Sequence, residues 1–132
     1  MNKLEDSGLA ARWTEVRARV AQACAEAGRP AEAVAILPVS KTFGPERIRE
    51  ALALGLGRFG ENKVQEIRSK AEALAGEPIA WVVIGHLQTN KAKDVARLVA
   101  EVQSLDRLEL AEALDRRLQS EGRALDVLVQ VK

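Results

Sequence analysis

Apolar residues follow two alternating patterns along most of this chain: short continuous runs, and stripes with a spacing of three or four residues. The continuous runs are typical of buried strands, and the stripes are typical of amphipathic helices. The strand-like runs start near Ala33, Arg58, Ala80, Glu101 and Leu125. They recur at intervals of a little more than 20 residues, which is close to the size of a compact strand–helix unit.

The stripes predict one helix before the first run and one helix after each of the first four runs. The first helix carries Leu9, Trp13, Val16, Val20 and Cys24, and Gly28 and Pro30 are predicted to end it. The later stripes are Ile48, Ala51 and Leu52; Val64, Ile67, Ala71 and Leu74; Ala92, Val95 and Val99; and Leu108, Ala111, Leu114 and Leu118. Pro45 suits the first turn of its helix, Asp106 and Glu109 form a plausible capping pair, and Gly122 is a plausible stop.

The predicted order is therefore α-(βα)₄-β, an α/β fold with a parallel sheet and right-handed crossovers. Two architectures fit this order: a doubly wound open sheet, and part of a (β/α)₈ TIM barrel. A full barrel typically needs about 250 residues, whereas this chain has 132, enough for a single domain over residues 1–132. The chain stops on the strand signal of residues 126–132, so we expect a truncated domain.

Composition narrows the class of protein. The net charge is +1, with 20 basic and 19 acidic residues, so nothing demands a nucleic-acid or membrane-surface partner. A single cysteine, Cys24, fits a reducing cytoplasm, and no run approaches the roughly 18 apolar residues of a membrane span. The chain has no tyrosine, one histidine, His86, and no cluster with metal-ligand spacing. A cytoplasmic protein without a metal site is the expectation.

Lys41 is the residue that is best placed for covalent chemistry. It closes the apolar run of residues 33–40 and precedes the predicted helix that starts at Pro45. Chemistry in α/β proteins concentrates at the carboxyl ends of strands. There a lysine amine can lose its charge through burial and form a Schiff base with a carbonyl group. The alternative is an ordinary solvated lysine at a strand end.

The other predicted strands also end in polar residues. Asn62 follows the second strand, Gly85 and His86 follow the third, and Ser104 ends the fourth. Because the carboxyl ends of parallel strands share one rim, these groups would converge with Lys41. Each also has a structural explanation: Asn62 or Ser104 as a helix cap, Gly85 as a tight turn, and His86 as a loop histidine.

Several of these segments together resemble the pyridoxal phosphate homeostasis family (the YggS/PROSC-type proteins). The segments are PVSKT at 38–42, FGENKVQE at 59–66, IGHLQTNK at 84–91, VQSLD at 102–106 and VLVQV at 127–131. Their order and spacing match as well. The resemblance covers essentially all of this chain, but only about the first half to three-fifths of a family member.

The resemblance implies a (β/α)₈ barrel similar to the N-terminal domain of alanine racemase. It implies that Lys41 holds pyridoxal 5′-phosphate as an aldimine, with Asn62, Gly85, His86 and Ser104 around the cofactor. The phosphate-binding loops of the family lie in later strands. The function implied is to carry or buffer the cofactor without clear turnover, with apo forms of pyridoxal-phosphate enzymes as possible partners.

Three alternatives stay open at this point. The first is a pyridoxal-phosphate enzyme of the racemase kind, although the absent tyrosine removes one of the usual two bases. The second is a lysine aldolase that works without added cofactor. The third is a non-binding fragment, in which open sheet edges at the strands of Ile36 and Val129 lead to self-association.

Overall fold

The computed structural model describes residues 8–132 of the chain. Its helices are α2 (Leu9–Glu26), α3 (Pro45–Ala53), α4 (Val64–Ala73), α5 (Ala92–Leu98) and α6 (Leu108–Glu121), with short 3₁₀ helices η1 (Ala31–Ala33) and η2 (Thr89–Lys91). Its strands are β1 (Arg58–Glu61), β2 (Ala80–Val83), β3 (Val99–Leu105) and β4 (Asp126–Val129). Helices and strands alternate along most of the described chain, as the periodicity predicts.

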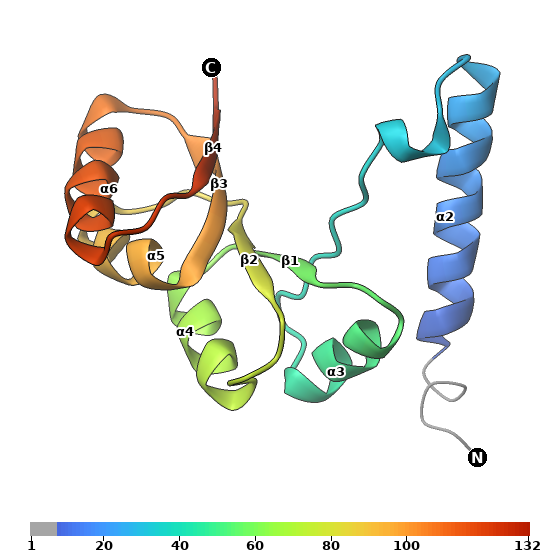
Figure 1. Ribbon diagram of the computed structural model, residues 1–132, viewed down its shortest axis with the longest axis horizontal. Coiled ribbons are helices and arrows are strands. Elements are labelled where there is room, and N and C mark those ends of the chain that lie inside the picture. The colour runs from blue at the N-terminus through green and yellow to red at the C-terminus, as the bar shows by residue number, and fades with distance from the viewer. Residues whose placement is uncertain (1–7) are drawn as a thin grey trace.

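The four strands form one sheet in the order β1-β2-β3-β4, and every neighbouring pair is parallel. Phe59 of β1 lies opposite Trp81 of β2, and their ring centroids are 6.2 Å apart. Figure 1 shows α4, α5 and α6 on one side of the sheet, whereas α2 stands apart from it. The predicted α/β fold with a parallel sheet is confirmed.

The core lies between the sheet and the helices that cover it. Val83 of β2 and Val102 of β3 are fully buried there, against Ile67 of α4, Val95 of α5 and Leu110 of α6. Each of these residues comes from a predicted strand run or lies on the core side of a helix. Burial of each such side chain contributes about 1.5–3 kcal/mol, so the contacts between the sheet and these helices stabilise the fold.

The first predicted strand is wrong as a strand. Its start forms η1, and the remainder is extended chain with a single bridge, between Val39 and Gly60. Two hydrogen bonds make this bridge: Ser40 N–H donates to Gly60 O at 3.0 Å, and Gly60 N–H donates to Pro38 O at 2.8 Å. A strand needs backbone partners along its length, and within residues 8–132 only Gly60 supplies one for this segment.

The helix ends agree with most of the sequence signals. Pro45 is the first residue of α3, and Gly28 and Gly122 adopt positive φ angles just after α2 and α6. The predicted capping pair of α6 is wrong: the helix begins after Arg107, and the Asp106 carboxylate accepts a hydrogen bond from the Arg107 guanidinium at 2.8 Å.

The apolar stripe of α6 also differs in part from the prediction. Leu108 is 70% exposed, and Leu110 and Leu114 are the residues that α6 buries. Ala113 and Leu118 are partly buried against the core beside them. In the part of the chain described, no helix combines the length and apolarity needed to cross a membrane.

Candidate functional site

Three of the predicted site residues form a continuous row across the carboxyl ends of β1, β2 and β3. Asn62 follows β1, and a Cβ atom placed on Gly85 would lie only 2.9 Å from the Asn62 Oδ1 atom. The Ser104 hydroxyl, at the end of β3, donates to the Gly85 carbonyl oxygen at 2.6 Å. Glycine at position 85 therefore lets the Asn62 side chain pack directly against the backbone of the next strand.

The structural explanations for these three residues do not hold. Neither Asn62 nor Ser104 caps a helix: α4 begins after Lys63 and α6 begins after Arg107, both without a side-chain cap. Gly85 has no positive φ angle, so close approach rather than turn geometry accounts for it. All three residues are thus positioned by contacts along the rim.

Lys41 sits in a tight turn beside this row. The turn is closed by a hydrogen bond from Phe43 N–H to Ser40 O at 3.1 Å, and Thr42 takes a φ angle of 68°. Lys41 is exposed, so the burial expected of a Schiff-base lysine is not present in the described chain. The Val39–Gly60 bridge places the segment that carries Lys41 next to β1.

A buried polar network lies directly before Lys41 in the chain. The Glu61 Oε2 atom accepts hydrogen bonds from the Ser40 hydroxyl at 2.5 Å and from Lys70 Nζ at 2.6 Å. Lys70 Nζ also donates to the Ser40 carbonyl oxygen at 2.8 Å. Glu61 is 0% exposed and Lys70 is 6% exposed, so the ion pair is shielded from water.

Sequence reasoning missed the role of Lys70, although a signal was present. Lys70 lies three residues after Ile67 and four before Leu74, and both of these residues are buried. A cation on the apolar stripe of a helix needs a buried partner of opposite charge. Glu61, at the end of the neighbouring strand, is that partner.

His86 is exposed and follows Gly85 in the loop after β2. A separate groove of about 450 Å³ lies beside the Lys41 turn, with Thr42, Phe43, Gly44 and Lys70 in its lining. None of the five predicted site residues lines this groove. The predicted site is therefore an open rim, and the groove lies next to it.

Comparison with known sequences identifies close relatives. No family profile matches the chain. It is 42% identical over 120 residues to the pyridoxal phosphate homeostasis protein of Aquifex aeolicus, which covers 91% of this chain and 53% of that protein. It is 39% identical over 125 residues to the protein of the same name from Pseudomonas aeruginosa, covering 95% and 54%. The chain spans about half the length of these relatives.

Solved structures give the same picture. The structure of PipY from Synechococcus elongatus with pyridoxal phosphate bound is 34% identical in sequence to this chain, with a TM-score of 0.74. The match covers 86% of this chain and 54% of the PipY chain. An unknown protein from Bifidobacterium adolescentis is 30% identical in sequence to this chain, with a TM-score of 0.84. The match covers 97% of this chain and 56% of that protein. The resemblance seen in the motifs thus extends to the arrangement of the elements.

Proposed function

The family of this chain is that of the pyridoxal phosphate homeostasis proteins, and from this premise we propose that the chain binds pyridoxal 5′-phosphate at the strand-end rim. The observation that carries the proposal is the row of Asn62, Gly85 and Ser104, beside the turn of Lys41. The residues present fit the cofactor, because Lys41 supplies a primary amine beside a rim that carries polar side chains.

Lys41 is the residue we assign to covalent attachment. Its nitrogen would bond to the aldehyde carbon of the cofactor, and the carbonyl oxygen would leave as water with the two amine hydrogens. The exposure of Lys41 in this structure leaves the amine accessible to a ligand from solution. Asn62 would offer its amide to polar ring substituents, and His86 would border the ring from the loop after β2.

We propose that the chain carries or buffers the cofactor and does not turn over a substrate. Racemisation with two bases needs a second acid or base opposite the lysine. The chain has no tyrosine and one histidine, and His86 lies in an exposed loop. The apo forms of enzymes that use the cofactor are the partners this function would serve.

The sheet order favours a barrel over a doubly wound sheet. A doubly wound sheet reverses its strand order at a switch point and places helices on both faces. Here the order β1-β2-β3-β4 is sequential, and α4, α5 and α6 lie on one side of it (Figure 1). We therefore propose that residues 8–132 form one arc of a (β/α)₈ barrel of the alanine racemase N-terminal-domain type.

The exposed sheet edge also supports self-association of the isolated chain. Val127, Leu128 and Val129 of β4 are all exposed, at the edge opposite β1. Exposed apolar edge strands pair readily with other chains. Size-exclusion chromatography with light scattering should give a dimer or larger species, and a sharp monomer peak would contradict this part of the proposal.

The main test is borohydride trapping with pyridoxal phosphate, followed by peptide mass mapping. A single adduct on Lys41 at near-stoichiometric cofactor is expected, and Lys41→Ala should abolish it. Lys63→Ala is the matched control, because Lys63 is an exposed lysine near the same rim and its loss should leave the Lys41 adduct unchanged. Label spread over Lys63, Lys91 and Lys93, or no label, would overturn the proposed site.

A further inference from the structure

We propose that Glu61 and Lys70 are positioning residues whose buried ion pair holds Ser40 and thereby fixes the turn that presents Lys41. The proposal rests on the proposed role of Lys41 in cofactor binding. The side chains of both residues are buried, and both act through Ser40. Their role would be to set the direction in which the Lys41 side chain extends from the backbone.

Ser40 is held at three of its atoms by two different elements. Its hydroxyl donates to the Glu61 carboxylate, its carbonyl oxygen accepts from Lys70 Nζ, and its N–H donates to the Gly60 carbonyl oxygen. Gly60 and Glu61 belong to β1, and Lys70 belongs to α4. The residue before Lys41 is thus tied to the sheet and to the helix layer, whereas the segment before it has only one bridge.

The Ser40 carbonyl oxygen also connects the ion pair with the turn itself. It accepts from Lys70 Nζ at 2.8 Å and from Phe43 N–H at 3.1 Å, so the oxygen that closes the turn around Lys41 and Thr42 is also held by Lys70. Thr42 has a φ angle of 68°, a conformation that a β-branched residue adopts only when its surroundings enforce it. The hydrogen bonds at Ser40 are the contacts that can enforce it.

The ion pair is better explained by geometry than by stability. Buried pairs seldom stabilise a fold more than well-packed apolar residues of similar volume would. Glu61 Oε1 has no hydrogen-bond partner among residues 8–132, so this carboxylate is only half satisfied. A pair that gains so little for the fold, yet places two charge-assisted hydrogen bonds on or beside Ser40, is suited to fixing a turn.

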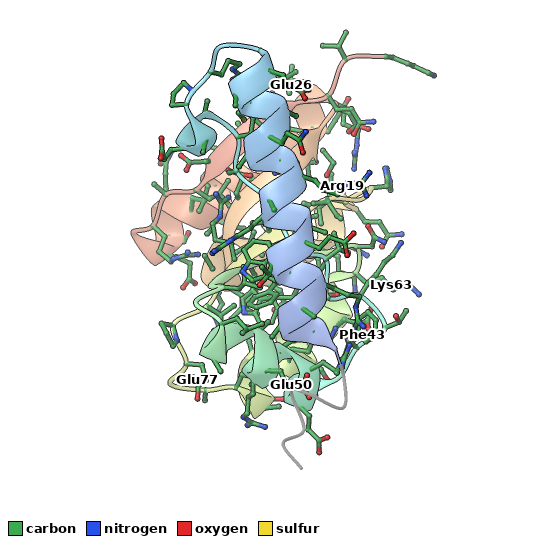
Figure 2. The ribbon with its side chains drawn as sticks, turned by 90° about the vertical axis from the view of Figure 1, so that its right-hand side faces the viewer. Arg19, Glu26, Phe43, Glu50, Lys63 and Glu77 are labelled. Atoms are coloured by element: carbon green, nitrogen blue, oxygen red, sulfur yellow. The ribbon has the colours of Figure 1, made fainter. Side chains whose placement is uncertain are left out.

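The test uses the 132-residue chain and separates positioning from stability. The variant Glu61→Leu/Lys70→Met replaces the pair by apolar side chains and should fold, as followed by circular dichroism. Two quantities are measured: the rate at which borohydride traps the cofactor on Lys41, with the unlabelled Lys63 peptide of the same digest as the loading reference, and amide hydrogen exchange at Phe43. Lys63 and Phe43 both lie on the right-hand side of α2 in Figure 2, and Lys63→Met is the matched control variant.

In the double variant we expect trapping at Lys41 to fall about tenfold and exchange at Phe43 to rise about tenfold, since charge-assisted hydrogen bonds are lost. Lys63 should stay unlabelled in every variant. Ser40→Ala, which removes one hydroxyl only, should give a smaller change in the same direction and covers the case of a double variant that does not fold. Wild-type values at both Lys41 and Phe43 in a folded variant would overturn the proposal.

Loss of the cofactor site and loss of the positioning role give different results. If the unmodified chain gives no adduct on Lys41, the proposed cofactor site is wrong, and exchange at Phe43 then decides alone whether the pair anchors the turn. If the adduct forms equally in all variants while Phe43 exchange rises, the pair holds the turn without directing Lys41, and the positioning role is overturned.

Discussion

The block of residues 58–121 and the segment of residues 27–44 are fixed by different kinds of contact. In the block, three parallel strands pair with one another and three helices bury apolar side chains against them. In the segment, one backbone bridge and a small polar network hold the chain in place. Lys41, the residue proposed to attach the cofactor, lies in the second region. Its geometry therefore depends on a few directional bonds, and the sheet's rim depends on packing.

Removing only the cation of the Glu61–Lys70 ion pair should give the largest loss of stability. Lys70→Met leaves the Glu61 carboxylate buried without its cation, and such a change costs about 3–5 kcal/mol. Adding Glu61→Leu should recover most of the loss, to within about 1 kcal/mol of the original chain. Urea unfolding of both variants measures this. A single variant as stable as the parent would show that the pair is solvated in solution.

The packed block should show a smaller loss at a single core position. Ile67 of α4 is 0% exposed, and Ile67→Ala should cost about 3 kcal/mol through lost contacts and a cavity. Val16 of α2 is 45% exposed, and Val16→Ala should change stability by less than about 0.5 kcal/mol. The same urea experiment compares them. Equal losses would contradict the burial of Ile67 in the packed block.

The same division explains what could be predicted from the sequence. Strands β1 to β4 and helices α3 to α6 follow from hydrophobic periodicity, because neighbours along the chain are also neighbours in the sheet. The run of residues 33–40 has the same local pattern as a strand. Its state depends on partners elsewhere in space, and a local pattern carries no information about them.

The candidate site was predictable to a similar extent. Asn62, Gly85 and Ser104 could be placed on one rim because parallel strands end on the same side, and the structure brings them into contact. The exposure of Lys41 and the partner of Lys70 could not be predicted, since the first depends on how residues 38–43 cross β1 and the second on how α4 packs against β1. Lys70 on an apolar stripe was a visible anomaly whose partner only the fold identifies.

Gly85 offers a moderate perturbation of the rim that leaves the polar network alone. In Gly85→Ala the new Cβ would meet Asn62 Oδ1 at 2.9 Å and Asn62 Cβ at 3.3 Å, so the Asn62 side chain must move. We expect a stability loss of about 1–2 kcal/mol from this overpacking and weaker cofactor trapping at Lys41. Asn62→Ala/Gly85→Ala should recover the stability but not the trapping. Recovery of both would remove Asn62 from the cofactor site.

The smallest effect is expected at Thr42, where the polar network imposes an unfavourable backbone conformation. A left-handed conformation costs a non-glycine residue about 1–2 kcal/mol, and glycine loses about 0.5–1 kcal/mol through its greater freedom in the unfolded chain. Thr42→Gly should therefore raise stability by about 0.5–1 kcal/mol.

Thr89 is the matched control, because it is a threonine without a positive φ angle, whereas Thr42 is the one non-glycine residue with positive φ within residues 8–132. Thr89→Gly should lower stability by a similar amount, as urea midpoints will show. If Thr42→Gly also lowers stability, the turn is relaxed in solution and Ser40 holds it under no strain.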